Sequence, residues 1–208
     1  MDKNYWNKYY SKKITNDNPS DFAKYCMDLY DNSFGHIYDI GCGNGRDTFF
    51  FSEKSIKTTG IDQSEKIIKS NNKIANNLGL NLNFIKEDFS SFDYDSFTNG
   101  PFSIYSRFTL HAINYIEEKR LLEHLYNSRR LKYLLIEARS INDQLYGEGQ
   151  EIGLHEFVTT HYRRFIDPME IKNKLSKWFN IISFKESQGF AKTKNEDPCI
   201  IRIIAKRL

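Results

Sequence analysis

The sequence is poor in cysteine and has almost no net charge. Its 208 residues include three cysteines, Cys26, Cys42 and Cys199, an odd number without the spacing of a metal or redox site. The 30 basic residues are nearly balanced by 27 acidic ones, which leaves a net charge of +3. Such a balance gives no reason to expect a nucleic-acid or membrane partner, and the cysteines suit a reduced compartment.

Long apolar stretches are also missing. No run of residues approaches the length that a membrane-spanning helix needs, and the first ten residues, MDKNYWNKYY, lack the apolar core of a signal peptide. An apolar content of 39% over this length suits a single globular domain covering residues 1–208. We therefore expect a cytoplasmic protein.

The segment that most defines the chain is residues 36–51, which read HIYDIGCGNGRDTFFF. Residues 37–40 are apolar enough for a short buried strand, and residues 46–51 are typical of the first turns of a helix. Between them, glycines at alternate positions allow a tight turn that a ligand can approach closely. Strand, glycine turn and helix together predict a nucleotide-type cofactor site.

The spacing of these glycines excludes two common cofactor motifs. A dinucleotide site would need its last glycine at the position of Arg46, and a phosphate-binding loop would need Gly-Lys-Ser/Thr to follow. A second predicted strand, residues 57–62, ends in Asp62, which lies 19 residues after Gly43 and could meet ribose hydroxyls. A third, residues 82–86, is followed by Asp88 and Phe89, which could bracket an adenine.

These three motifs, DIGCGNG, GID and EDF, resemble those of class I S-adenosylmethionine-dependent methyltransferases. The resemblance implies an α/β, Rossmann-like fold with a seven-stranded, mostly parallel sheet, helices on both faces and a C-terminal antiparallel hairpin. It implies S-adenosyl-L-methionine as cofactor and S-adenosyl-L-homocysteine as product. The residues that we expect to bind the cofactor are Tyr10, Asp39, Gly41, Gly43, Gly45, Arg46, Asp62, Gln63, Asp88, Phe89 and Ser106.

The rest of the chain fits alternating helices and strands. We expect residues 1–34 to form a helical lid or cap, in which Asn18 caps a second helix and Pro19 lies in its first turn. Residues 140–167 show no confident element, and we expect them to form an acceptor-side loop. Further predictions are helices 64–79, 113–128 and one from Asp167, and strands 101–108, 131–139, 181–186 and 199–205.

The reacting groups should follow the fourth and fifth strands, at whose carboxyl ends ligands bind in such sheets. His111 is a candidate base, although it could equally bond a backbone group, and His161 is its rival. The Ser106-Arg107 exit offers no acid for a catalytic metal and no cysteine nucleophile, so we expect neither. The residues expected to bind an anionic acceptor are Arg107, Arg139, His161, Tyr162, Arg163 and Arg164. For these the alternative is a solvated charged loop.

The runs SRFTLHAI, EARS, HYRRF and EDPCIIR also resemble a subgroup of small bacterial methyltransferases associated with capsule and surface-polysaccharide gene clusters. This resemblance implies methylation of a small, anionic, sugar-linked acceptor at a hydroxyl, amine, phosphate or phosphoramidate group. An RNA- or protein-modifying methyltransferase and a non-catalytic cofactor-binding partner of a glycosyltransferase remain the alternatives.

Overall fold

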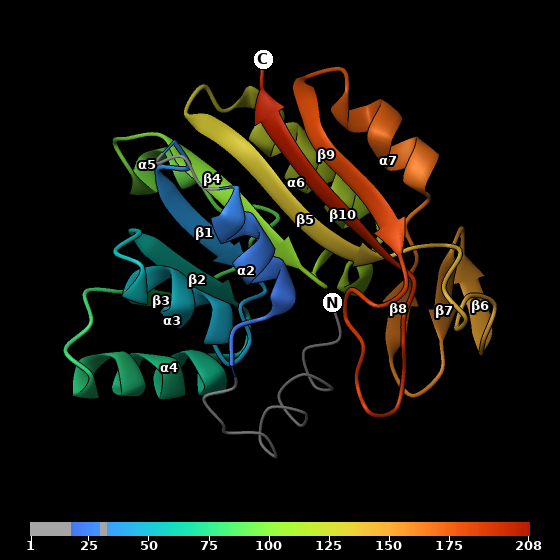
Figure 1. The fold of residues 1–208 in the computed structure, drawn as a ribbon, viewed down its shortest axis with the longest axis horizontal. Coiled ribbons are helices and arrows are strands. Elements are labelled where there is room, and N and C mark those ends of the chain that lie inside the picture. The colour runs from blue at the N-terminus through green and yellow to red at the C-terminus, as the bar shows by residue number, and fades with distance from the viewer. Residues whose placement is uncertain (1–17, 30–32) are drawn as a thin grey trace.

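The computed structural model describes residues 18–29 and 33–208. Tyr10 and most of the predicted lid lie outside the described residues. The centre of the molecule is a seven-stranded sheet of order β3-β2-β1-β4-β5-β10-β9, with helices packed on both faces (Figure 1). No helix in the described part of the chain is long and apolar enough to cross a membrane.

The first half of the chain alternates strictly between strands and helices. Adjacent strands among β3, β2, β1, β4 and β5 pair in parallel. Every residue of β1 and β2 is buried, as expected for central strands that are covered on both faces. The elements are α2 (Asp21–Asp28), β1 (His36–Ile40), α3 (Arg46–Glu53), β2 (Thr58–Asp62), α4 (Glu65–Asn77), β3 (Asn83–Lys86), α5 (Tyr94–Phe97) and β4 (Phe102–Arg107).

The second half completes the sheet and adds a smaller one. Strand β10 is antiparallel to both β5 and β9, so it is the one reversed strand of the large sheet. The elements are the 3₁₀ turn η1 (Leu110–Ala112), α6 (Tyr115–Asn127), β5 (Leu131–Arg139), β6 (Gln150–Gly153), β7 (Glu156–Val158), β8 (Tyr162–Arg164), α7 (Pro168–Leu175), β9 (Phe179–Ser187) and β10 (Ile200–Arg207). The predicted α/β architecture with its C-terminal hairpin is thus confirmed.

The hydrophobic core has one main layer on each side of the sheet. Phe22 and Cys26 of α2 and Phe51 of α3 pack against one face. Leu122 of α6 and Leu175 of α7 pack against the other. The parallel strands therefore end at a common, well-supported edge, from which the loops that carry the candidate functional residues emerge.

Two local predictions differ from the structure. The N-cap of α2 is Ser20, whose Oγ accepts a hydrogen bond from Ala23 N (3.0 Å), so neither the cap at Asn18 nor a first-turn position for Pro19 is correct. Between Ser140 and Asp167 the chain also contains regular structure. It forms the antiparallel sheet β6-β7-β8, whose strands have only three or four residues each.

Candidate functional site

Three positions of the glycine turn between β1 and α3 have backbone angles that favour glycine. Gly41, Gly43 and Gly45 have φ angles of +67°, +53° and +76°. A Cβ on Gly41 would lie 2.8 Å from Thr109 Oγ1, and one on Gly45 would lie 2.7 Å from the Phe84 ring. The turn therefore packs closely against its surroundings at both ends.

Hydrogen bonds from two other elements hold this turn in place. Gly43 N donates to Asp62 Oδ2 (3.1 Å), and Asn71 Nδ2 of α4 donates to the carbonyl of Gly43 (2.8 Å). Asp62 Oδ1 accepts from Ser64 N (2.8 Å). Burial raises the pKa of Asp62, and these backbone donors oppose the rise. The carboxylate is thus fixed at the sheet edge, and each oxygen can still accept a further hydrogen bond.

Two further carboxylates, Asp39 of β1 and Asp47 of α3, support the glycine turn. Asp39 Oδ2 accepts from Thr48 Oγ1 (2.6 Å), and burial together with neighbouring Asp47 raises the pKa of Asp39 to about 8. Asp47 accepts from Ser20 N (2.7 Å) and from the hydroxyl of Tyr105 (2.8 Å). Asp39 and Asp47 therefore anchor α3 to β1, α2 and β4, which makes both of them supports of the turn.

The other residues predicted to bind the cofactor differ in their burial and in their hydrogen bonds. Asp88 Oδ1 accepts from Ser90 N (2.9 Å), which closes a turn just after β3. Phe89 is fully buried in the main core, and its carbonyl accepts from Tyr94 Oη (2.7 Å). Arg46 opens α3 with its Nε 3.8 Å from a carboxylate oxygen of Asp47, and Gln63 is half-buried beside Asp62. Their roles in cofactor binding stay predictions.

The exit of β4 carries buried polar atoms without partners. Ser106 Oγ and His111 Nδ1 have no hydrogen-bond partner among residues 18–29 and 33–208, and His111 is only 8% exposed. Phe108 adopts φ +57°, unusual for a residue with a side chain, and its ring lies 5.1 Å from that of His111. Buried polar atoms without partners and local strain both favour a ligand site at this exit.

The charges around His111 are mostly positive. Burial lowers its pKa well below the usual value of 6.5, and the charges of Arg139, Arg163, His161 and Arg107 lower it further. His111 is therefore neutral at physiological pH and can accept a proton or a hydrogen bond. The predicted acceptor residues of β4, β5 and β8 thus act on one buried imidazole.

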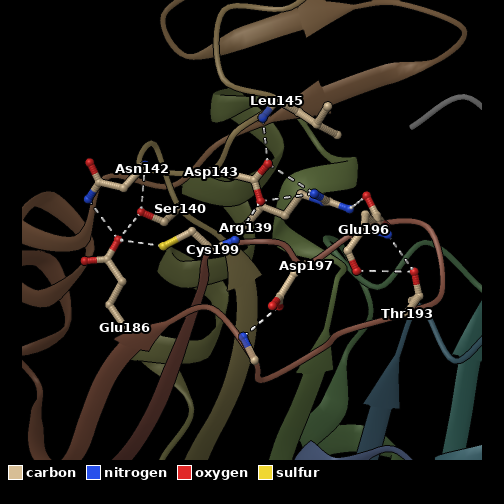
Figure 2. Close-up of polar contacts among 11 residues, drawn as sticks. Arg139, Ser140, Asn142, Asp143, Leu145, Glu186, Thr193, Glu196, Asp197 and Cys199 are labelled. Atoms are coloured by element: carbon tan, nitrogen blue, oxygen red, sulfur yellow. Dashed lines mark hydrogen bonds and ion pairs between the residues drawn. The ribbon is translucent and has the colours of Figure 1, made fainter.

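Two of these arginines are already paired with buried carboxylates. Arg107 Nε lies 2.9 Å from Glu137 Oε1, and Glu137, which is fully buried, also binds Arg202 Nε (2.7 Å). Arg139 bonds to Asp143 (3.1 Å) and Glu196 (2.7 Å), as Figure 2 shows. No local sequence pattern indicates the pairs Glu137–Arg202 and Arg139–Glu196, because the residues of each pair are more than 50 positions apart.

The two arginines of β8, Arg163 and Arg164, differ in burial and in their hydrogen-bond partners. Arg164 is buried, pairs with Glu118 of α6 and donates to the carbonyl of Ile113 (3.1 Å). Arg163 is half-buried and donates to Thr159 Oγ1 (2.9 Å). The Tyr162 hydroxyl donates to Ile113 O, and His161 Nδ1 lies 3.1 Å from Thr160 Oγ1. Arg164 thus braces β8 against α6, whereas Arg163 is more accessible.

No group of three or more His, Cys, Asp or Glu side chains in the described ranges is arranged to hold a metal ion. The parallel sheet, the glycine turn and the carboxylate at the end of β2 instead define a class of α/β proteins that bind nucleotide-like cofactors at a strand edge.

Comparison with known proteins identifies the family within this class. A family model described as "Methyltransferase domain" matches residues 31–142, more than half of the chain, and the protein therefore belongs to that family. S-adenosylmethionine is the cofactor of these methyltransferases.

Individual relatives are distant. The chain is 24% identical to carboxy-S-adenosyl-L-methionine synthase of Nautilia profundicola over 144 residues, which cover 63% of this chain and 60% of that protein. A methyltransferase structure from Methanosarcina mazei superposes with a TM-score of 0.73 at 21% identity, over 88% of this chain and 97% of the other.

The structure of the glycopeptide N-methyltransferase MtfA with S-adenosylmethionine gives a TM-score of 0.64 at 15% identity, over 89% of this chain and 94% of that one. At such identities these superpositions concern the fold.

Proposed function

We propose that this methyltransferase acts on a small, anionic, sugar-linked acceptor. Bound S-adenosylmethionine would supply an electrophilic methyl group, which the lone pair of the acceptor's oxygen or nitrogen would take while the electrons of the broken sulfur–carbon bond stayed on sulfur, giving S-adenosylhomocysteine. The protein's own part is to align the acceptor, exclude water and take a proton where the acceptor carries one.

The described residues fit this cofactor. Three of the five residues in the glycine turn carry no side chain of their own, and Asp62 retains acceptor capacity for the two hydroxyls of a ribose. We infer that Gly41, Gly43 and Gly45 contact the amino acid part and that Asp62 binds the ribose. We also infer that Asp88, which is half-buried just after β3, binds at the adenine.

The observation that carries the acceptor class is the electrostatic setting of His111. Its Nδ1 is buried without a partner among the described residues, and arginines on three strands act on it, with a further contribution from His161. Because Arg107 and Arg139 already pair with carboxylates, an anionic acceptor would bind where one of these partners is displaced, and an arginine fork is well suited to a phosphate or carboxylate.

We infer that His111 accepts the acceptor's proton if the methylated atom is a hydroxyl or amine. It is neutral at working pH, as a base must be, although its low pKa limits its strength. His161 on the neighbouring loop is the alternative base. A phosphate oxygen would need no base, and His111 would then only donate or accept a hydrogen bond.

The test is to incubate the protein with methyl-labelled S-adenosylmethionine and a bacterial small-molecule extract and to follow the label by mass spectrometry. A labelled sugar phosphate or sugar nucleotide supports the proposal. Label found in RNA or protein moves the acceptor to a macromolecule. Label retained only in a modified cofactor would indicate chemistry like that named for the Nautilia relative.

His111→Gln and His161→Gln form the matched pair that assigns the base. We expect His111→Gln to lower kcat about 100-fold with cofactor affinity unchanged, and His161→Gln to leave kcat within a few-fold. The reverse pattern would assign His161. Unchanged kcat in both would mean that the acceptor needs no base.

A further inference from the structure

Arg139 is held at the carboxyl end of β5 by two carboxylates that differ in character. Its Nη1 bonds to both carboxylate oxygens of Asp143, at 3.2 and 3.1 Å, and its Nη2 bonds to Glu196 Oε2 at 2.7 Å. Figure 2 shows the guanidinium lying between these two side chains. The Arg139 side chain is only 7% exposed, so the groups that pair with its guanidinium determine the local charge.

Asp143 is a fixed partner of Arg139. Its side chain is fully buried and also accepts from Leu145 N (2.9 Å) and Cys199 N (2.9 Å). Glu196, by contrast, is 35% exposed and comes from the loop of residues 188–199 that joins β9 to β10. Of the two carboxylates, Glu196 is the one that can leave without breaking the end of β5.

The formal charge of the groups around Arg139 explains why Glu196 would have to leave before an anion could bind. One guanidinium faces two carboxylates, so the cluster of Arg139, Asp143 and Glu196 carries a formal charge of −1. An anion that approached Arg139 in this state would be repelled, although the arginine's charge reaches His111. Once Glu196 has left, the remaining pair is neutral and Nη2 is open to an anion.

We propose that Glu196 occupies the place on Arg139 that the acceptor's anionic group takes, so that acceptor binding releases the 188–199 loop. This inference rests on the proposed function, because it assumes an anionic acceptor. Glu196 then acts as an internal competitor and sets how tightly an anion must bind in order to enter.

Hydrogen bonds hold both ends of the 188–199 loop, so we expect the loop to open in its middle. Hairpin loops usually have two to five residues, and long loops are often functional. At one end Arg202 Nη2 donates to the carbonyl of Phe190 (2.9 Å), and at the other Cys199 N donates to Asp143. Thr193 and Glu196 bond to each other through their backbones (2.8 Å), so they should move together.

Limited trypsin digestion tests the release without needing the acceptor, because Lys192 and Lys194 are exposed on this loop. We expect Glu196→Gln to be cut there about tenfold faster than the unmodified protein, as expected for the loss of one charge-assisted hydrogen bond. Inorganic phosphate should speed cleavage of the unmodified protein but not of Glu196→Gln, with sodium chloride matching ionic strength.

Glu186→Gln is the matched control. Glu186 is a carboxylate at the same end of the hairpin, but it bonds to Ser140 and Asn142 instead of Arg139. We expect its cleavage rate to match that of the unmodified protein. Equal rates for Glu196→Gln and the unmodified protein, or a loop unaffected by phosphate, would overturn the proposal.

Calorimetric titration gives an independent measure. We expect Glu196→Gln to bind phosphate about tenfold more tightly, with affinity for S-adenosylmethionine unchanged. Unchanged or weaker phosphate binding would show that Glu196 does not compete. A protein that binds phosphate in this way but never binds S-adenosylmethionine would contradict the proposed function and leave the competition between Glu196 and anions intact.

Discussion

Asp62 supports the fold at the place where we propose that the ribose binds. Its oxygens accept from Gly43 N and Ser64 N, so the carboxylate joins the glycine turn to the start of α4. We predict that Asp62→Ala weakens S-adenosylmethionine binding by about 100-fold, because the turn loses a charge-assisted bond and the ribose loses its acceptor. Isothermal titration calorimetry measures this, with exposed Asp28→Ala as control. Binding within threefold of the unmodified protein would contradict the assignment.

We expect Arg164 to stabilise the fold and its neighbour Arg163 to contact the acceptor. We predict that Arg164→Gln lowers the free energy of unfolding by about 2 kcal/mol, because Glu118, which is 2% exposed, keeps only Lys174 as an ionic partner and the carbonyl of Ile113 loses its donor. Arg163→Gln should change stability by less than about 0.5 kcal/mol, because its side chain is half-buried and bonds to exposed Thr159. Urea denaturation of both variants checks the contrast.

If Arg163 contacts the acceptor, its substitution should instead raise the acceptor's KM about tenfold while kcat stays unchanged. A loss of stability in Arg163→Gln as large as that in Arg164→Gln would reverse these roles.

His36 makes stability depend on pH. It lies at the start of β1, with Nε2 2.9 Å from Thr59 Oγ1 and its ring stacked on Tyr38. Burial, with a contribution from Lys57, lowers its pKa from 6.5 to about 4. Below pH 6.5 the unfolded chain therefore takes up a proton that the folded chain does not, and stability falls as pH drops towards 4.

We predict that this group costs about 2 kcal/mol of stability at pH 5 relative to pH 8. His36→Gln should lose that part of the pH dependence in urea titrations at the two pH values. If both proteins lose the same free energy between pH 8 and pH 5, His36 does not titrate as described.

At the scale of elements, the start of α6 is closed by reciprocal hydrogen bonds. Asn114 Oδ1 accepts from Glu117 N (2.9 Å), and the Glu117 carboxylate accepts from Asn114 N (2.9 Å), which forms a complete capping box. We predict that Asn114→Ala costs about 1 kcal/mol and lowers Tm by about 3 °C. Exposed Asn127→Ala, at the other end of the helix, should leave Tm unchanged in the same scan.

What the sequence predicted at this scale depended on element length and on local signals. The β1 strand, the glycine turn and α3 were predictable for two reasons. The strand is buried throughout, and glycines at alternate positions indicate a tight turn with positive φ angles. The caps at Ser64 and Asp167 were also found from neighbouring residues alone. Strands β6, β7 and β8 were missed, because runs of three or four residues carry too little alternation to be distinguished from a loop.

At the scale of the whole molecule, the part that no local pattern could predict is the long-range pairing of charges. Glu137 lies between Arg107 and Arg202, and Arg139 meets Glu196, across separations that only the finished sheet defines. The sequence indicated which strand ends carry arginines, because their order follows the strands. It could not indicate which of them are neutralised internally, and that decides how much positive charge an acceptor meets.

Cofactor binding should be visible in the stability of the whole molecule. The glycine turn and the ends of β1 and α3 that flank it are tied to α2, α4, β2 and the segment after β4, so unfolding of these elements should disrupt the site. The bonds are those of Asp47, Asn71, Asp62 and Thr109. We predict that S-adenosylmethionine at about 1,000 times its Kd stabilises the fold by about 4 kcal/mol and raises Tm by about 10 °C.

A single domain would show this as one calorimetric transition that shifts as a unit. In Asp62→Ala, whose Kd should be about 100-fold higher, the stabilisation at the same concentration should fall to about 1.4 kcal/mol and the shift in Tm to about a third. Two transitions, only one of which moves with S-adenosylmethionine, would mean that the half of the sheet around β5, β10 and β9 unfolds separately from the cofactor site.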